Sequence, residues 1–214
     1  MEESTARQRK IKRMIENRQE GVIVLENIAD PHNAAAVWRT ADAFGFQKIY
    51  LVYSKESLIN PKKIGKASSS SANKWLSFKI FKSVEGCYAE LKKDGYKIYA
   101  TVLDKEAKKL GEIKFTDKKT AIVLGNEHRG LSEEAIKGAD VKIYVPMKGM
   151  VQSMNISVTA AIFMYELDRQ RKIKTHPPLS RVPPLKKGGK ENTINNYELS
   201  SREKEELEKE YKFL

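Results

Sequence analysis

Cysteine is almost absent from this sequence of 214 residues, in which Cys87 is the single example. One thiol can form neither an internal disulfide nor a cluster of thiolate ligands, so both of those protein classes are excluded. Histidine is also scarce, and no Cys or carboxylate cluster stands at metal-binding spacing around His32. We therefore expect a protein of the reducing cytoplasm that requires no metal.

Long apolar runs are missing as well. No run approaches the ~18 residues of a membrane-spanning helix, and the opening residues, MEESTARQRKIK, lack the apolar core of a signal peptide. Neither end has the Trp- or Phe-rich amphipathic pattern of a membrane-surface helix. These absences predict a soluble protein with no membrane partner.

Acidic residues are too few to balance the basic ones. The chain has 28 Asp and Glu against 40 Lys and Arg, which gives a formal net charge of +12. Such an excess favours a polyanionic partner, either nucleic acid or an acidic membrane surface. Because the chain ends do not resemble membrane-surface helices, nucleic acid is the favoured partner.

The central part of the chain alternates between two patterns, and its 40% apolar content suits one globular domain with small appendages. Apolar, β-branched runs predict strands at residues 22–27, 48–53, 75–81, 96–103, 120–124 and 141–145. Helical patterns lie at residues 33–44, 84–93, 132–138 and 153–171. Several strands are apolar nearly throughout, as in sheets covered on both faces. We predict an α/β fold with a mostly parallel sheet.

Two appendages flank this predicted domain of residues 21–172. Residues 1–20 form a basic extension whose apolar residues have helical spacing. Residues 173–214 begin as a Pro- and Gly-rich linker and end in a predicted helix at 199–214, opened by a capping box of Ser200 and Glu203. We expect this helix to dock on the core or on a second subunit.

The predicted helix at residues 153–171 has almost no polar face in its first three turns. Ile156, Val158, Phe163 and Tyr165 are among the apolar residues distributed around it. A helix that is apolar all round is buried all round. Since one sheet covers only one side, a dimer interface would cover the other.

The familiar phosphate-binding patterns are absent, since neither a P-loop nor a G-x-G-x-x-G fingerprint occurs. In open α/β sheets, ligands bind beyond the carboxyl ends of the strands. The loops to consider are therefore those that follow Asn27, Leu103, Leu124 and Val145.

The first of these loops leads into the predicted helix at residues 33–44. Asn33 can cap this helix with its side-chain oxygen, and Arg39 follows nearly two turns later. Val37 and Ala41 form its core stripe. Taken alone, this segment is explained more simply as a capped helix that carries a solvated arginine.

The second loop is rich in glycine. Gly125 allows another group to approach the backbone closely, and Gly130 allows a positive φ before Ser132 caps the next helix. A simple structural turn explains the same residues. The serine run at residues 68–71 is either a phosphate loop or, as we favour, a flexible linker.

The third loop carries three methionines. Met147, Met150 and Met154 can line an adaptable apolar pocket, although a methionine cluster also suits a core. Ser153 and Asn155 place neutral hydrogen-bonding groups at the start of the long helix.

Together and in this order, the three loops form a specific pattern. They read DPHNAAAVWRTADAFG at residues 30–45, LGNEHRGLS at 124–132 and VPMKGMVQSMNISV at 145–158. This trio resembles the three motifs of the SpoU (TrmH-like) RNA ribose 2′-O-methyltransferases of the SPOUT superfamily. The similarity covers roughly residues 21–172.

The resemblance implies a C-terminal trefoil knot, an obligate homodimer and S-adenosylmethionine as methyl donor. The cofactor contacts that it implies are Thr101, Leu124, Gly125, Asn126, Val145, Pro146, Met147 and Met154. The catalytic residues that it implies are Arg39, Asn33, Glu127, Ser153 and Asn155, with Asn33 orienting Arg39. Because arginine is effectively always protonated, we expect Arg39 to grip the RNA and stabilise a developing alkoxide rather than act as a base.

The same resemblance implies a tRNA substrate. The segments at residues 72–76 and 97–101, and the short segment before the first predicted strand, are similar to those of family members that methylate guanosine 18. The alternatives are a ribosomal-RNA 2′-O-methyltransferase and a catalytically silent RNA-binding dimer. We expect the RNA phosphates to contact Arg7, Arg9, Lys10, Arg13, Arg169, Arg171, Lys172 and Lys174.

Overall fold

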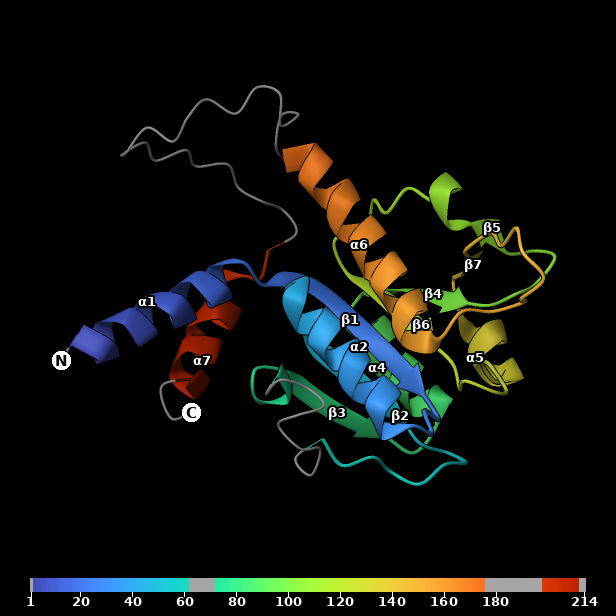
Figure 1. Cartoon of the computed structure of the whole chain (residues 1–214), viewed down its shortest axis with the longest axis horizontal. Helices are drawn as coiled ribbons and strands as arrows, with labels where there is room; N and C mark the ends of the chain where they lie inside the picture. Colours follow the sequence, from blue (N-terminus) through green and yellow to red (C-terminus); the bar gives the residue numbers. More distant parts are fainter. Residues whose placement is uncertain (1, 62–71, 176–197, 212–214) are drawn as a thin grey trace.

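The computed structural model describes residues 2–61, 72–175 and 198–211, with the side chains of residues 2–6 and 172–175 left out (Figure 1). The predicted RNA contacts of Lys172 and Lys174, and the linker predicted at residues 68–71, lie outside this description. Within it, no helix combines the length and the apolar character needed to cross a membrane.

Seven parallel strands form one sheet in the order β3-β2-β1-β6-β4-β7-β5. The strands are β1 Gln19–Glu26, β2 Phe46–Val52, β3 Ser77–Phe81, β4 Lys97–Thr101, β5 Lys108–Lys109, β6 Thr120–Leu124 and β7 Val141–Tyr144. The main crossover helices are α2 Pro31–Ala43, α4 Val84–Lys93 and α5 Glu133–Gly138, and α6 Ile156–Thr175 follows β7. The predicted α/β fold with a parallel sheet is confirmed, while the knot stays a prediction from the family resemblance.

Local differences from the prediction have simple causes. The bounds of β6 and α4 are as predicted, but β3 starts at Ser77 because residues Ala72–Lys74 form the short 3₁₀ helix η1. Strand β5 was missed because its two lysines carry no apolar signal, and it forms by pairing with β7. A second 3₁₀ helix, η2, follows it at Leu110–Glu112.

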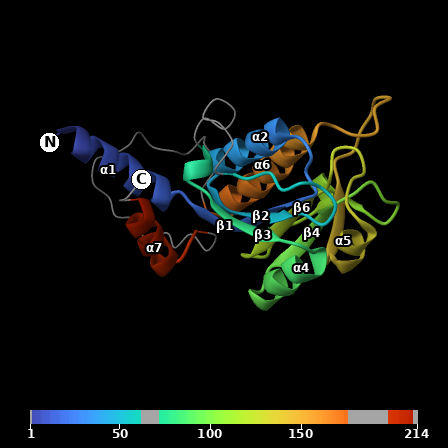
Figure 2. The ribbon, with the colours of Figure 1, turned by 90° about the horizontal axis from the view of Figure 1, so that it is seen from below.

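Figure 2 shows helices on both faces of the sheet, with α2 and α6 on one face and α4 and α5 on the other. All eight residues of β1 are buried, as expected for a central strand with both faces covered. On one face, Leu25 belongs to a cluster with Trp38 and Phe163. On the other face, Val24 belongs to a cluster with Leu91. This layering holds the carboxyl ends of the central strands in a rigid row.

Within a single chain, helix α6 is buried on the side that faces the sheet, and the predicted dimer that would cover its other side stays a prediction. Ala160, Phe163 and Leu167 are buried against the sheet side. In contrast, the exposed fraction is 48% for Val158 and 55% for Tyr165. The rings of Tyr165 and Phe44 pack edge to face, with their centroids 6.3 Å apart. A single chain therefore leaves part of the apolar surface of α6 open to solvent.

The terminal helices α1 (Glu2–Glu16) and α7 (Ser201–Tyr211) lie side by side at one end of the molecule (Figures 1 and 2). Ile15, Leu207 and Tyr211 form a small apolar cluster between them. The Tyr211 hydroxyl lies 2.6 Å from the carbonyl oxygen of Trp75, and the two rings meet edge to face. The terminal helix thus docks on its own chain, one of the two predicted arrangements.

The predicted capping box at the start of α7 is confirmed. Ser200 Oγ accepts a hydrogen bond from Glu203 N at 3.3 Å, and the Glu203 carboxylate accepts one from Ser200 N at 2.9 Å. Burial of Glu203 opposes its ionisation, but these bonds and the Lys48 ammonium at 3.0 Å lower its pKa to about 2. Lys48 also contacts the buried Glu20 at 3.2 Å, so α7 is tied to β1 and β2 by charge.

Arg171 does not lie on the surface, which corrects its assignment to an RNA-binding face. Its side chain is 3% exposed and donates hydrogen bonds to Gln19 Oε1 at 2.8 Å, to the Glu20 carbonyl and to the Lys118 carbonyl at 3.0 Å. It therefore joins the end of α6 to the start of β1. Arg169, two residues earlier, is 43% exposed and forms two 2.7 Å bonds with Glu166.

Replacing Arg171 tests this structural role. Arg171→Met removes the donor of two buried acceptors and one part-buried acceptor, so the free energy of unfolding should fall by about 3 kcal/mol. Arg169→Met breaks only an exposed pair and should change it by less than about 0.5 kcal/mol. The measurement is urea unfolding followed by circular dichroism at one protein concentration. Equal losses in the two variants would contradict the assignment.

Candidate functional site

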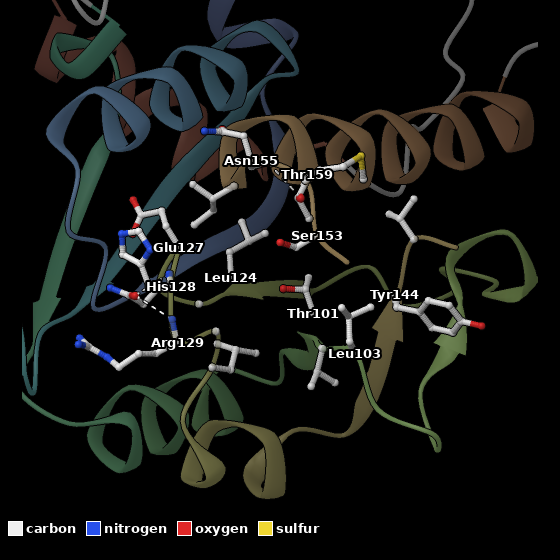
Figure 3. A pocket seen from close by; sticks show the side chains of 18 of the residues that line it. Thr101, Leu103, Leu124, Glu127, His128, Arg129, Tyr144, Ser153, Asn155 and Thr159 are labelled. Atoms are coloured by element: carbon white, nitrogen blue, oxygen red, sulfur yellow. Dashed lines mark hydrogen bonds between the residues drawn. The ribbon is translucent and has the colours of Figure 1, made fainter. Parts of the chain in front are cut away.

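A cavity of about 780 Å³ opens at the carboxyl ends of four neighbouring strands, β1, β6, β4 and β7 (Figure 3). Its walls come from the four loops that the sequence analysis selected, together with the first turns of α6. This is the position at which open α/β sheets bind ligands. A cavity thus lies where the sequence analysis places the site.

Most of the residues predicted for the site line this cavity. The predicted cofactor contacts among them are Thr101, Leu124, Gly125, Asn126, Val145, Met147 and Met154, and the predicted catalytic residues are Asn33, Glu127, Ser153 and Asn155. Pro146 is absent from the lining and exposed. Met150 is also no part of the wall, because its side chain is fully exposed, which corrects its proposed place in an apolar pocket.

The first loop enters α2 differently from the prediction. Asp30, not Asn33, is the N-cap, and its carboxylate accepts a 2.8 Å hydrogen bond from His32 N. Pro31 follows at the first helical position, where a missing N–H costs nothing. The Asn33 amide is therefore free to face the cavity instead of capping the helix.

Glu127 connects the second loop to this helix start. Its carboxylate accepts hydrogen bonds from Ala29 N at 3.2 Å, Asp30 N at 3.3 Å and Asn33 Nδ2 at 3.1 Å. A carboxylate at a helix N-terminus also interacts favourably with the helix dipole. Glu127 thus holds the β1–α2 loop in place. Because it accepts from the amide nitrogen of Asn33, the amide oxygen of Asn33 points away from it.

The same chain of hydrogen bonds continues to the third loop. Asn33 Oδ1 accepts from Asn155 Nδ2 at 3.0 Å, and Asn155 Oδ1 accepts from Ser157 N at 2.8 Å. Asn155 therefore caps the start of α6 while it contacts α2. Because each amide is held at both ends, Glu127, Asn33 and Asn155 form one ordered polar edge of the cavity. Figure 3 shows Glu127 and Asn155 on the same side of the cavity, with Ser153 nearby.

The second loop is a tight turn that only glycine permits. The backbones of Asn126 and Gly130 exchange hydrogen bonds of 3.0 and 2.9 Å, and Gly130 has a φ of +67°. A Cβ on Gly125 would lie 2.2 Å from the Gly130 carbonyl carbon. The close backbone approach predicted at Gly125 and the positive φ at Gly130 are both confirmed.

Asn27 is a structural residue that the sequence analysis did not select. It has a φ of +50°, a left-handed conformation that Asn tolerates better than most residues. Its carbonyl accepts from Asn126 Nδ2 at 2.7 Å, and its side-chain oxygen accepts from the backbone of Ser54 and Lys55, each at 2.9 Å. Its place at the end of β1 is the only signal for this role. Asn27 joins the cavity wall to residues 54–60, which we call the rim loop.

Burial also determines the protonation state of Tyr53, which directly precedes the rim loop. Burial raises the pKa of Tyr53 to about 12, and the nearby charge of Glu127 adds to this effect. Tyr53 is therefore a neutral phenol at neutral pH and packs against the apolar core.

Arg39 lies outside the cavity lining. It is exposed on α2, about 9 Å along the helix axis from Asn33 at 1.5 Å per residue. Among the described residues, its guanidinium has no hydrogen-bond or ion-pair partner. The prediction that Asn33 orients Arg39 is wrong for this chain, because the Asn33 amide is bonded to Glu127 and Asn155.

Several lining residues were not predicted. They are Ala29, Asp30, Val102, Leu103, His128, Arg129, Gly130, Leu131, Ile136, Ile143, Tyr144, Gln152, Ile156, Thr159 and Phe163. Val102 and Leu103 directly follow β4. Their loop was considered because it follows the carboxyl end of a strand, although its residues carry no motif of their own. Thr159 lies one turn after Asn155, to which its backbone donates at 2.9 Å. Helical periodicity could have found Thr159.

The arrangement offers amides, hydroxyls and a few charged groups, among them Glu127 and Arg129, beside apolar side chains such as Leu124 and Met154. No group of three or more His, Cys, Asp or Glu side chains that could hold a metal occurs in the described part of the chain.

Comparison with known proteins places these features in a family. A model of the SpoU rRNA Methylase family matches residues 20–165, which contain all three loops. The chain belongs to the SpoU methylase family. The hydrogen-bonded edge of Glu127, Asn33 and Asn155 thus joins the three SpoU motifs in space.

Individual SpoU relatives match over most of their length. The tRNA (guanosine(18)-2′-O)-methyltransferase of Thermus thermophilus is 36% identical over 171 residues, 79% of this chain and 86% of that protein. The protein of the same name from Aquifex aeolicus is 35% identical over 178 residues, 81% and 82% of the two chains. The solved structure of the A. aeolicus TrmH/SpoU tRNA modifying enzyme has a TM-score of 0.78 and 29% identity, and covers 98% of each chain.

Gly125→Ala tests the tight turn of the second SpoU motif. The added methyl group would collide with the Gly130 backbone, so the free energy of unfolding should fall by at least about 1–3 kcal/mol. Gly111→Ala is the matched control, since a Cβ there meets nothing within 4 Å. Thermal and urea unfolding measure both. A Gly125→Ala protein as stable as the control would contradict the geometry of the turn.

Proposed function

We propose that this protein is an S-adenosylmethionine-dependent RNA ribose 2′-O-methyltransferase that modifies guanosine 18 of tRNA. The observation that carries the proposal is the bonded edge of Glu127, Asn33 and Asn155, which joins the three SpoU motifs beside one cavity. The relatives named for guanosine 18 support the choice of substrate. We further propose that the protein acts as a homodimer in the cytoplasm.

The cavity suits S-adenosylmethionine in size and chemistry. Its volume of about 780 Å³ lies in the range of small-molecule sites. Leu124, Val145, Met147 and Met154 offer apolar surface for a flat adenine, and sulfur-containing side chains adapt to such shapes. Gly125 and Asn126 of the tight turn also line the cavity, so backbone polar groups there would face the cofactor. When bound, this cofactor supplies an electrophilic methyl group on a cationic sulfur.

The polar edge is suited to orient the acceptor ribose. Methyl transfer to an oxygen is largely a problem of alignment, with the reacting atoms ~3–3.5 Å apart. Asn155 and Asn33 have amide orientations fixed by their neighbours, so they would present a defined pattern of donors and acceptors to the sugar. Glu127 is committed to three N–H donors, which makes it a positioning residue rather than a base. Ser153, also in the lining, would complete this edge.

Arg39 would serve the RNA from outside the cavity. Its exposed guanidinium has no described partner, and its planar fork matches a phosphate or ribose oxygen pair. Because it stays protonated, it would stabilise negative charge that develops on the acceptor oxygen, while phosphate or solvent takes the proton.

The remaining RNA affinity would come from basic side chains distant from the cavity. Arg7, Arg9, Lys10 and Arg13 on α1 are exposed, and Arg169 is exposed although paired with Glu166. Phosphate contacts of this kind make binding steeply dependent on salt. The uncovered apolar residues Val158 and Tyr165 on α6 support a homodimer through this helix.

Methylation of defined transcripts tests the proposed function. With cofactor labelled in its methyl group, an unmodified tRNA transcript should accept label at guanosine 18, as mapped by nucleotide analysis. The same transcript with 2′-deoxyguanosine at that position lacks the acceptor oxygen and should accept none. Label on a ribosomal-RNA transcript alone would replace the substrate assignment. No label on either RNA, despite cofactor binding, would favour the silent RNA-binding dimer.

Arg39→Lys tests the need for a planar guanidinium. Loss of a charge-assisted, two-point contact of ~1.5–3 kcal/mol should lower the turnover number by about 10- to 100-fold. Cofactor binding, measured by calorimetry, should not change, because Arg39 lies outside the cavity lining. Arg202→Lys on the distant helix α7 is the control. Near-normal turnover in Arg39→Lys would refute the role.

A further inference from the structure

Arg129 differs from the buried arginines Arg18 and Arg171 in the exposure of its side chain. Arg18 and Arg171 are 1% and 3% exposed and are bonded to buried acceptors, as structural arginines are. The side chain of Arg129 is 55% exposed although its residue belongs to the cavity lining. Its backbone is fixed by a 3.1 Å bond from its N–H to Asn126 Oδ1. A rigid backbone thus presents a solvent-accessible guanidinium beside the cavity.

The guanidinium of Arg129 is paired with Glu56 of the rim loop. Asn27 holds the start of this loop by accepting bonds from Ser54 N and Lys55 N, each at 2.9 Å. Glu56 itself lies outside the cavity lining. In Figure 3 the Arg129 guanidinium lies on the side of its backbone away from Thr101 and Leu103. The charged group therefore faces the outer rim rather than the enclosed part of the cavity.

We propose that Arg129 binds a phosphate of the substrate RNA, and that Glu56 occupies its guanidinium until the RNA arrives. The inference rests on the proposed function and adds a substrate-binding residue and an internal competitor to it. Carboxylate and phosphate present similar oxygen pairs to the guanidinium fork, so one can replace the other. An exposed ion pair is weak, which makes this replacement easy.

The position of Arg129 favours RNA phosphate over the carboxylate of the cofactor. A cofactor enclosed by Leu124, Val145 and Met154 would lie on the inner side of the turn. The Arg129 guanidinium, which is paired with Glu56, lies on its outer side. An RNA strand that delivers a ribose to the Asn155 edge must also place its neighbouring phosphates outside the cavity. The tight turn of the second SpoU motif holds the backbone of Arg129 in place, so that its side chain would lie within reach of such a strand.

The test compares Arg129→Gln, Glu56→Gln and the double variant with the whole wild-type protein. The readouts are kcat, KM for the tRNA transcript, tRNA affinity at several salt concentrations, and cofactor affinity by calorimetry. Arg129→Gln should raise KM for tRNA about 10-fold, as loss of one charged contact does, and should reduce the salt slope by about 1. Its kcat and cofactor affinity should not change.

Glu56→Gln should have the opposite effect. It frees the guanidinium from an exposed pair, so tRNA should bind about two- to five-fold more tightly. In the Arg129→Gln background, Glu56→Gln should have no effect, because the competition is gone. The control is Glu206→Gln, which removes the carboxylate of the exposed Arg202–Glu206 pair on α7 and makes the same change in net charge.

Three outcomes would overturn the inference. The first is weaker tRNA binding in both single variants, which would mark the pair as a structural tether of the rim loop. The second is loss of cofactor affinity in Arg129→Gln, which would assign the guanidinium to the cofactor carboxylate. The third is an equal gain in Glu206→Gln, which would mean a non-specific charge effect. Failure of the proposed function is separate, since wild-type protein would then methylate no tRNA.

Discussion

The interaction on which the site depends is the set of hydrogen bonds accepted by Glu127. This carboxylate comes from the turn after β6, and all three of its donors belong to the loop and first turn after β1. The two strands are neighbours in the sheet, so a single side chain can span their carboxyl ends. With the Asn33 amide held at one end by Glu127, its other end is left to receive Asn155. The third motif is thereby aligned with the first through an interaction that begins in the second.

Such a polar edge needs a stiff support, because small shifts would break hydrogen bonds near 3 Å. The parallel sheet supplies it, with β1 buried along its whole length and helices on both faces. Buried arginines tie the periphery to this support: Arg18 contacts Asp42 on α2 at 2.7 Å, and Arg171 joins α6 to the start of β1. Buried charges of this kind are costly unless all their bonds are made, so they also enforce one arrangement of the connected elements.

The functional surfaces are less constrained than this support. Val158 and Tyr165 on α6, and the exposed basic residues of α1, have no role in the interior of a single chain. Arg129 is intermediate, because its backbone is fixed in the tight turn while its guanidinium is held only by a carboxylate on the rim loop. The molecule thus combines an ordered cavity with a partly exposed ion pair at its edge.

The sequence by itself determined the fold class, the approximate positions of most elements and the place of the candidate site. β-branched runs and helical periods are local signals, and the order of parallel strands brings their carboxyl ends together. Tertiary structure alone decided which side chains meet across long separations. Asp30 displaced Asn33 as the helix cap, Arg171 became buried, and Arg39 remained outside the cavity. The cap at Asp30, with Pro31 after it, is a local signal that the sequence also carries. Ion pairs and burial, in contrast, depend on neighbours tens of residues away, such as Glu127 for Asn33, which no local pattern encodes.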